Sequence, residues 1–199
     1  MKKRRVGIYG GTFNPPHNGH IISAMRFCDQ MALDELKIIP AFIPPHKAYD
    51  SVVSCDERIE MCKIAFSDID KATISDIEIK RGGTSYTYLT LQELTNEEDE
   101  LFFLCGTDMI LSMDNWRNPE IIFELANICY FRREDEQLNK EKIEEKVRKY
   151  KADYNATIYE IIGEPIDISS SQIRDANVNY ADYLPPSIIK YIKEKGLYQ

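Results

Sequence analysis

Two histidines, His17 and His20, lie in the segment GGTFNPPHNGH (residues 10–20), although the whole chain has only three. The two glycines let the backbone approach a ligand closely, and the two prolines stiffen the loop. A short apolar run at residues 5–9 precedes the segment, and a helical pattern begins near Asn18, which we expect to cap that helix. A helix N-terminus suits phosphate, and adjacent imidazoles stabilise charge that develops on a phosphoryl group. The segment therefore predicts phosphate chemistry.

Two other interpretations of the histidines stay open at this point. His17 and His20 together with His46 form a set that zinc accepts, although no cysteine or carboxylate lies nearby at ligand spacing. The other alternative is a purely structural role. The segment does not match GxGxxG, so a nicotinamide dinucleotide cofactor is not expected.

A second segment, ISSSQIRD (residues 168–175), has donors suited to a polyphosphate. Ser169 and Gln172 have the spacing of a capping box, which predicts another helix start with exposed N–H groups. The serine hydroxyls and the guanidinium of Arg174 would add hydrogen-bond donors and a charge. The alternative is an ordinary serine-capped helix with a surface arginine.

Further polar segments follow predicted strands or turns. A lone tryptophan is usually part of a core, but the polar context DNWRNP also suits a platform that stacks on an aromatic ring. Each of the other segments has an ordinary structural alternative, namely a proline loop, a helix cap or a surface arginine pair. The segments are IPPHK (43–47), GGTSYTYLT (82–90), GTDM (106–109), DNWRNP (114–119) and FRRE (131–134).

Strand-like and helix-like patterns alternate along the chain, which predicts an α/β fold with a Rossmann-like doubly wound parallel sheet. Ligands of such sheets bind outside the carboxyl ends of the strands, where the segments above fall. We expect one domain over residues 1–199, with a small C-terminal helical subdomain. The expected strands are 5–9, 36–39, 73–79, 101–105, 128–131 and 157–162. The expected helices begin near residue 18 and near SSSQIRD, and cover 55–66, 87–97, 109–113, 120–126, 134–151 and 186–195.

Composition excludes several classes of protein. The 199-residue chain has a net charge of −8 and a pI of about 5.0, which argues against broad binding to nucleic acid or anionic membranes. No apolar run is long enough to span a membrane, and VGIY after the basic start is too short for a signal peptide. Five cysteines without a CxxC motif predict reduced thiols in the cytoplasm.

Together, GGTFNPPHNGH and ISSSQIR resemble the paired signatures of the nucleotidyltransferase superfamily that carries an HxGH motif. The ordered set with IPPHK, SYT, GTD, the following tryptophan and FRR resembles the bacterial nicotinate mononucleotide adenylyltransferases over residues 6–190. The resemblance implies transfer of the adenylyl group of ATP, accompanied by Mg²⁺, to nicotinate mononucleotide, which gives deamido-NAD and pyrophosphate. It implies no covalent enzyme intermediate, and it is compatible with a homo-oligomer.

The resemblance also implies roles for particular residues. His17, His20 and Arg174 would be catalytic, with His20 at the α-phosphate in the transition state. The residues implied for ATP are Gly10, Gly11, Thr12, Phe13, His17, Gly19, His20, His46, Lys47, Gly106, Asp108, Ser170, Ser171 and Arg174. The residues implied for the mononucleotide are Asn14, Ser85, Tyr86, Thr87, Trp116 and Arg133.

This sequence departs from the family pattern at three places. Asn14 and Leu89 stand where many bacterial members carry Asp, and FRRE lacks the proline and glycine that often follow the arginine. These departures concern the mononucleotide pocket, and the sequence does not decide between nicotinate and nicotinamide. The competing hypotheses are another HxGH enzyme of the pantetheine-phosphate adenylyltransferase or cytidylyltransferase type, a non-catalytic nucleotide sensor, and a metal hydrolase.

Overall fold

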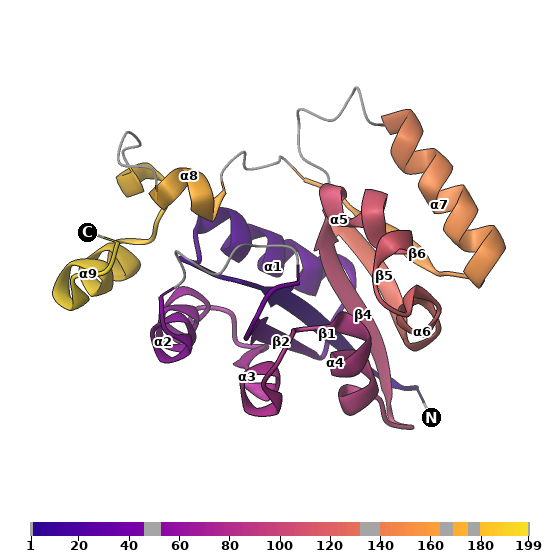
Figure 1. Cartoon of the computed structure of the whole chain (residues 1–199), viewed down its shortest axis with the longest axis horizontal. Coiled ribbons are helices and arrows are strands. Elements are labelled where there is room, and N and C mark those ends of the chain that lie inside the picture. The colour runs from indigo at the N-terminus through magenta and orange to yellow at the C-terminus, as the bar shows by residue number, and fades with distance from the viewer. Residues whose placement is uncertain (1, 46–52, 132–139, 164–168, 175–179, 199) are drawn as a thin grey trace.

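The computed structural model describes residues 2–45, 53–131, 140–163, 169–174 and 180–198. Six parallel strands form one sheet in the order β3-β2-β1-β4-β5-β6 (Figure 1). This order reverses between β1 and β4, so the predicted Rossmann-like doubly wound sheet is confirmed. The strands are β1 (Arg4–Gly11), β2 (Glu35–Pro40), β3 (Ala72–Ile74), β4 (Asp99–Gly106), β5 (Ala126–Phe131) and β6 (Ile158–Ile161).

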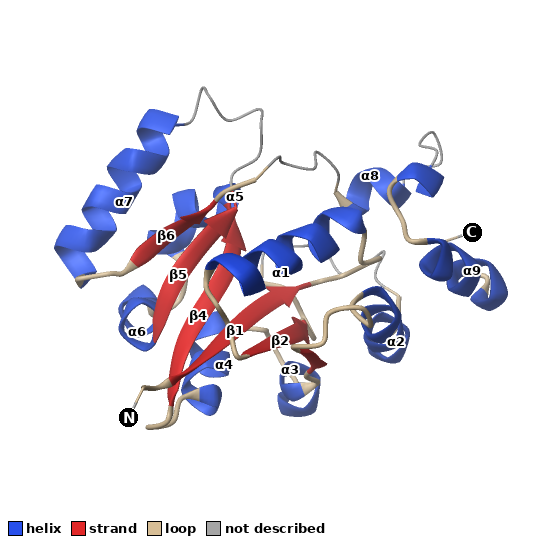
Figure 2. Cartoon of the chain, turned by 180° about the vertical axis from the view of Figure 1, so that it is seen from behind, coloured by secondary structure: helices blue, strands red, loops and turns tan. Residues whose placement is uncertain are grey.

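Helices cover both faces of the sheet, and Figure 2 shows α1 lying across one of them. The first group of helices is α1 (Asn18–Gln30), α2 (Cys55–Ala65), α3 (Ile77–Arg81) and α4 (Thr87–Leu94). The second is α5 (Thr107–Ser112), the 3₁₀ turn η1 (Met113–Asn115), α6 (Pro119–Leu125) and α7 (Lys140–Tyr154). The last is α8 (Ser170–Arg174), the 3₁₀ turn η3 (Tyr180–Asp182) and α9 (Pro186–Lys195).

The alternation of side chains along the strands builds a separate core on each face. Phe102 and Leu104 of β4 pack with α1, α2 and α9, whereas Leu101 and Phe103 pack with α4, α5, α6 and α7. A parallel strand buried on both faces reads as a continuous apolar run, which is why LFFLC was recognisable in the sequence. The C-terminal helices contribute Ile173, Ile188 and Ile192 to the first core, so their packing is continuous with that of α1 and α2.

Two sequence predictions need correction. The strand predicted over 73–79 ends at Ile74, and residues 77–81 form α3 instead. The alternating apolar pattern was misleading because Glu78 is buried and accepts a hydrogen bond from Thr90 at 2.6 Å, so it is not a solvent-facing strand residue. The helix predicted over 134–151 is described from residue 140 and runs on to 154. Its charged surface carries a buried stripe that includes Ile143 and Tyr150.

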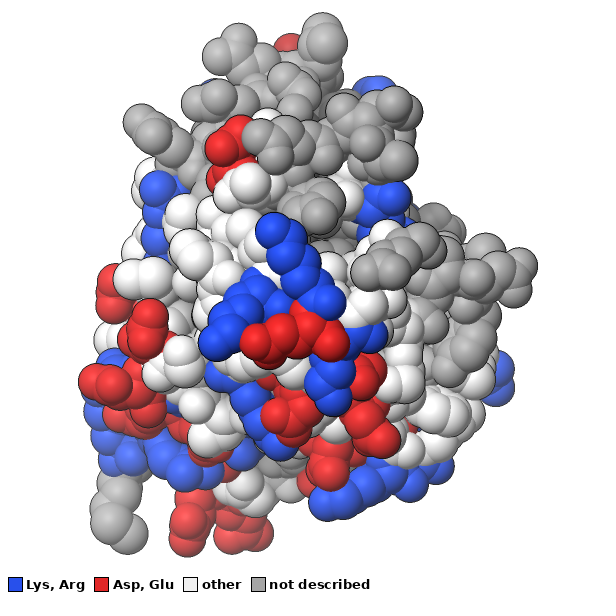
Figure 3. All heavy atoms as spheres, turned by 90° about the vertical axis from the view of Figure 1, so that its left-hand side faces the viewer, with Lys and Arg blue, Asp and Glu red and all other residues white. Residues whose placement is uncertain are grey.

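The end of the molecule that carries α2 and α9 mixes charges of both signs. In Figure 3, Lys and Arg side chains alternate with Asp and Glu over the described part of this face. Lys195 lies 3.9 Å from Glu57, and Lys190 lies 3.8 Å from Glu194. This described surface therefore offers no continuous basic stripe of the kind that nucleic-acid binding needs.

An ion pair joins the amino ends of β1 and β4. The Arg4 guanidinium donates to both carboxylate oxygens of Asp99, with Nε–Oδ1 at 2.8 Å and Nη2–Oδ2 at 3.0 Å. The hydrogen bond from Arg4 is the main cause that lowers the pKa of the Asp99 carboxyl to about 2. A carboxyl whose pKa is lower in the folded chain stabilises the fold above its unfolded pKa. That stability is lost as the pH falls from about 5 towards 2.

We expect Asp99→Asn to lower the free energy of unfolding at pH 7 by about 1 to 2 kcal/mol. The loss is not larger because solvent around the half-exposed Arg4 side chain screens part of the attraction. The difference from wild type should shrink as the pH is lowered to about 2.5. Urea denaturation at both pH values measures it, with the exposed Asp70→Asn as the control. A deficit that stays the same at both pH values would mean that the ion pair is not its source.

Candidate active site

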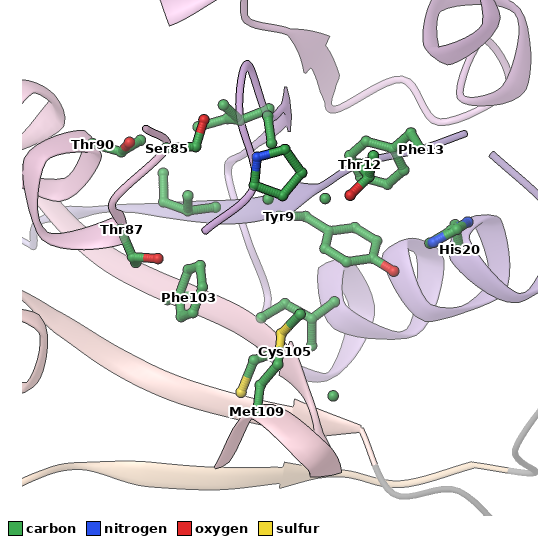
Figure 4. A pocket seen from close by; sticks show the side chains of 18 of the residues that line it. Tyr9, Thr12, Phe13, His20, Ser85, Thr87, Thr90, Phe103, Cys105 and Met109 are labelled. Atoms are coloured by element: carbon green, nitrogen blue, oxygen red, sulfur yellow. The ribbon is translucent and has the colours of Figure 1, made fainter. Parts of the chain in front are cut away.

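A cavity of about 670 Å³ opens at the carboxyl ends of β1 and β4, where the strand order reverses. This volume is in the range of small-molecule sites. Figure 4 shows His20 on one side of Tyr9, and Ser85, Thr87 and Thr90 on the other. The cavity wall includes most of the residues proposed from sequence, namely Gly10, Gly11, Thr12, Phe13, His17, Gly19, His20, Ser85, Tyr86, Thr87, Gly106, Asp108, Trp116 and Ser170.

Six of the proposed residues are not placed at the cavity. His46, Lys47 and Arg133 lie outside the described residues. Asn14, Ser171 and Arg174 are described but do not line the cavity wall. Lining the cavity does not test a role, so the roles given to all the proposed residues stay predictions.

The N-terminus of α1 carries the two histidines into the cavity. The cap residue is His17 rather than the expected Asn18, because His17 has an extended backbone with φ −139° and the helix begins directly after it. Asn18 instead donates its backbone N–H to the Tyr183 carbonyl at 2.9 Å, which ties the start of α1 to the C-terminal segment.

The two imidazoles lie close together, with their planes tilted by 33°. Their ring centroids are 3.7 Å apart, and the His17 backbone N–H donates to Nδ1 of His20 at 3.2 Å. An accepting Nδ1 carries no proton, so in the neutral ring the proton is on Nε2, which is then a donor. Phe13 packs edge-on against the same ring, with centroids 5.0 Å apart. His20 therefore presents a positioned N–H donor without needing a positive charge.

The turn after β1 has a strained backbone at Phe13. Its φ of +49° is in the left-handed region, which non-glycine residues rarely adopt. The Phe13 side chain is buried and packs against Tyr9 and Phe66 with centroids 5.5 and 5.8 Å apart. A Cβ atom on Gly11 would approach the Phe13 ring to 2.9 Å, so this turn needs glycine at that position.

The segment SSSQIR places α8 against the same turn. The predicted capping box is present, since Ser169 Oγ accepts from the Gln172 N–H at 3.2 Å and the Ser169 N–H donates to Gln172 Oε1 at 2.7 Å. Ser170 Oγ donates to the Pro15 carbonyl at 2.9 Å. Arg174 was proposed as a phosphate ligand, but its Nη1 donates to the carbonyls of Asn14 and Ser170. In this structure, Arg174 therefore fastens α8 to the turn.

Asn14 also has an internal role. Its Oδ1 accepts from the Tyr198 hydroxyl at 2.7 Å and from the Val53 N–H at 3.4 Å. The side chain is buried, and these contacts join the turn to the C-terminus and to the start of α2. Sequence reasoning placed Asn14 at the mononucleotide, but the structure places it behind the cavity wall.

The far end of the cavity is formed by the start of α4. The loop after β2 is held there, because the Phe42 N–H donates to Ser85 Oγ at 2.8 Å and the Ser85 N–H donates to the Ile43 carbonyl at 2.9 Å. Tyr86 caps α4 with its backbone alone, and the first turn has no acidic residue. The helix therefore directs N–H groups and a partial positive charge at this end of the cavity.

Aromatic side chains complete this end. The half-buried Trp116 ring lies edge-on to Phe103, with centroids 6.3 Å apart at 76°. The Arg117 guanidinium lies 5.3 Å from the centroid of the Tyr86 ring. Trp116 and Tyr86 both line the cavity, and aromatic side chains with a helix N-terminus suit a site that binds an aromatic ring bearing a polar group.

A polar cluster around Asp114 ties the turn before Trp116 to α7. Asp114 accepts from Lys146 Nζ at 2.7 Å and from Lys149 Nζ at 2.9 Å. The Tyr150 hydroxyl contacts Asp114 Oδ1 at 3.1 Å and donates to the Ile110 carbonyl at 2.9 Å. Burial favours the protonated Asp114, but the hydrogen bonds from Lys146, Lys149 and Tyr150 outweigh it and hold the pKa of this carboxyl well below its usual range.

We expect Tyr150→Phe to lower the free energy of unfolding by about 1 to 3 kcal/mol, because it leaves the buried Ile110 carbonyl without this donor. Urea unfolding followed by the fluorescence of Trp116, the one tryptophan of the chain, measures the change. Tyr154→Phe on the same helix is the matched control, since Tyr154 packs on the same Phe123 ring. Equal losses in the two variants would show that the hydroxyl contacts contribute nothing.

Between the two ends, Gly106 is the last residue of β4 and Asp108 lies in the first turn of α5. A Cβ atom on Gly106 would lie 2.7 Å from Asp108 Oδ1, so glycine leaves room for this carboxylate at the cavity. Cys105 also lines the wall, and burial is the main cause that raises the pKa of its thiol well above the ordinary value. A thiol that stays protonated is a poor nucleophile.

Sequence reasoning missed several wall residues. They include Tyr9, Ser23, Glu78, Thr90, Phe103, Met109 and Arg117. Tyr9 and Phe103 lie in the apolar runs that were read only as strands, and the position of Tyr9 directly before Gly10 was the available signal. Glu78 was hidden by the incorrect strand over 73–79.

The described residues hold no group of three or more His, Cys, Asp or Glu that would bind a metal ion. His46, the third member of the zinc alternative, lies outside the part of the chain that the structure describes. In the same part of the chain, no helix is long and apolar enough to cross a membrane. All five cysteines are free.

This arrangement, a Rossmann-like sheet with an HxGH helix start at its switch point, defines a class of nucleotide-binding transferases. A model of the cytidylyltransferase-like family matches residues 8–176, and the chain belongs to this family. Within it, the chain is 38% identical to a protein of Geotalea daltonii named probable nicotinate-nucleotide adenylyltransferase, with 98% of each chain covered. A protein of the same name from Clostridium acetobutylicum is 37% identical over the full length of both chains. The resemblance recognised from the motifs is therefore confirmed.

The fold has a solved counterpart in a distant relative. The nicotinic acid mononucleotide adenylyltransferase of Plasmodium falciparum, solved in complex with NaAD, superposes with a TM-score of 0.79. Its sequence is 21% identical, and the match covers 98% of this chain and 97% of the other. At this identity the similarity supports the shared fold.

Proposed function

We propose that this chain transfers the adenylyl group of ATP to nicotinate mononucleotide, which gives deamido-NAD and pyrophosphate. The names of the full-length relatives support this activity. The observation that carries it is that one cavity has the N-terminus of α1 at one end and the N-terminus of α4 at the other. Each helix start suits an anion, and the reaction brings together a triphosphate and an acidic mononucleotide.

The reaction is a direct transfer. A phosphate oxygen of the mononucleotide forms a bond to the α-phosphorus of ATP, and the bond from that phosphorus to the bridging oxygen of the β-phosphate breaks. Pyrophosphate leaves with the electron pair. His20 donates from Nε2 to the oxygens of the α-phosphate, whose negative charge is redistributed in the transition state. The α1 N-terminus holds the leaving phosphates, and the Ser170 hydroxyl would join it by turning its proton away from the Pro15 carbonyl.

No nucleophile of the protein is required. Cys105, the cysteine at the cavity wall, is kept as a thiol by burial, as described above. Catalysis therefore consists of positioning the two substrates and stabilising charge.

Mg²⁺ enters with ATP in this proposal. The ion would be held mainly by phosphate oxygens and water, and it would supply charge neutralisation on the phosphates. We place the reaction in the cytoplasm, since five free cysteines suit a reducing compartment.

Nicotinate is the acceptor that fits the far end of the cavity better. Its carboxylate is an anion that accepts hydrogen bonds, and the start of α4 presents N–H donors with no acidic residue in the first turn. A carboxamide at the same place would present its own N–H group to those donors.

The test is pyrophosphate release from ATP and Mg²⁺ with a panel of acceptors. We expect turnover with nicotinate mononucleotide, and a lower kcat/KM with nicotinamide mononucleotide. Equal or higher kcat/KM with the amide would overturn the acid preference. Turnover only with phosphopantetheine or in a cytidylyl transfer would replace the proposed activity by that of another member of the superfamily.

A further inference from the structure

Arg58 of α2 is a buried cation that has no place in the chemistry described so far. Its side chain has 0% exposure, which is unusual for arginine. Among the described residues its contacts are a carbonyl and a thiol and include no carboxylate, and its Nε has no hydrogen-bond partner there. A buried charge without a counter-charge is costly, so a compensating interaction is expected.

The contacts of Arg58 lead to the turn after β1. Nη1 donates to the Thr12 carbonyl at 3.0 Å, and Nη2 contacts Cys55 Sγ at 3.2 Å. Thr12 and Phe13 line the cavity, whereas Arg58 does not. The guanidinium therefore lies behind the wall and holds the turn from the side away from the ligand space.

The hydrogen bond from Arg58 to the Thr12 carbonyl fixes the direction of the next N–H group along the chain. The C=O and N–H of a trans peptide point in opposite directions, so the Thr12 carbonyl directed at Arg58 turns the Phe13 N–H the other way. In the described residues, this N–H meets no acceptor. Left-handed backbone such as that of Phe13, at φ +49°, is a feature of the concave N–H nests that bind anions.

We propose that Arg58 is a positioning residue that keeps the Thr12–Phe13 turn ready for the phosphates of ATP and adds a positive charge behind it. The bound phosphates would supply the negative charge that Arg58 lacks in the described structure. This inference rests on the proposed function for the identity of the ligand. It differs in kind from the roles of His17 and His20, because Arg58 acts through the backbone of the turn.

Equilibrium titration of ATP, pyrophosphate and nicotinate mononucleotide, each with Mg²⁺, tests the inference in Arg58→Met. We expect the dissociation constants of ATP and pyrophosphate to rise by at least about 10-fold, as for the loss of a charged hydrogen bond. The dissociation constant of the mononucleotide should change by less than about 2-fold, because Arg58 contacts neither Ser85 nor the start of α4. Ile188→Ala, a buried change on α9 in the same core, is the control for lost stability.

The outcomes are distinct. Unchanged pyrophosphate affinity in Arg58→Met, or a parallel loss for all three ligands such as Ile188→Ala would give, overturns the role of Arg58. If Arg58→Met does not fold, Arg58→Lys is used, because it keeps the positive charge but lacks the two Nη donors. We then expect a smaller loss of affinity, again confined to ATP and pyrophosphate. Equal affinities of Arg58→Lys and wild type for all ligands would also contradict the proposal. If wild-type protein binds neither ATP nor pyrophosphate, the proposed function fails instead.

Discussion

Replacing His20 by alanine is expected to lower kcat by about 10²- to 10³-fold with little change in stability. The removed Nε2–H donor acts on the charge that develops in the transition state, and the loss of one such donor has an effect of this size. The ring is not a large part of the core, since it lines the cavity and is only partly buried. The KM for ATP should therefore change much less than kcat.

Steady-state kinetics with saturating substrates measures the effect. Met25→Ala is the matched control, because Met25 is on the same helix, is 49% exposed and does not line the cavity. His20→Gln tests the N–H donor itself, because the glutamine side chain carries an amide N–H that reaches part of the space filled by the imidazole. A kcat for His20→Ala within about 3-fold of wild type would remove His20 from the mechanism.

Replacing Trp116 by alanine is expected to act on the other substrate. We expect the KM for nicotinate mononucleotide to rise by about 10-fold or more, because stacking of a base on an aromatic side chain is worth about 1 to 3 kcal/mol. The KM for ATP should stay within about 2-fold, because the Trp116 ring belongs to the Phe103 and Tyr86 end of the cavity. Trp116→Phe keeps a ring and should show an intermediate KM.

The selectivity of the Trp116 effect is what distinguishes a stacking platform from a core residue. Because the ring contacts Phe103 of the second core, Trp116→Ala also removes apolar contacts. Thermal unfolding of the variant therefore accompanies the kinetics. Equal increases in KM for ATP and for the mononucleotide, together with a lower Tm, would assign Trp116 to packing.

Local patterns predicted much of this fold because they depend on nearby residues. The strand LFFLC is apolar on both sides because helices cover both faces of the sheet. The capping box at Ser169 and Gln172 was readable from a three-residue spacing and is present in the structure. The start of α1 was placed to within one residue, with His17 in the cap position instead of Asn18.

Local patterns of this kind could not predict the long-range contacts. Nothing local shows that Tyr198 at the C-terminus reaches Asn14, or that Arg58 reaches Thr12. The motif ISSSQIR predicted that Arg174 acts at the phosphates, but not that its guanidinium holds the Asn14 carbonyl. For these residues, the partner lies 46 to 184 positions away along the chain, and only the fold brings the two together.

The same limit explains the incorrect strand over 73–79. The spacing of Ile77 and Ile79 is compatible with a strand, but the deciding contact is made by the polar residue between them. Glu78 is bound by Thr90 of α4 and lies 3.9 Å from Arg81, which stabilises a helical turn at this position. A pattern of apolar residues cannot predict that a carboxylate is buried and hydrogen-bonded.

In the proposed reaction, one cavity brings the α-phosphorus of ATP to the phosphate of nicotinate mononucleotide. The most direct test supplies ATP labelled at the α-phosphorus with Mg²⁺ and nicotinate mononucleotide, and follows the label by chromatography and mass spectrometry. We expect the label in deamido-NAD, with one pyrophosphate formed for each dinucleotide. Label that appears only in AMP, or no dinucleotide at all from the wild-type protein, would show that the chain does not catalyse this transfer.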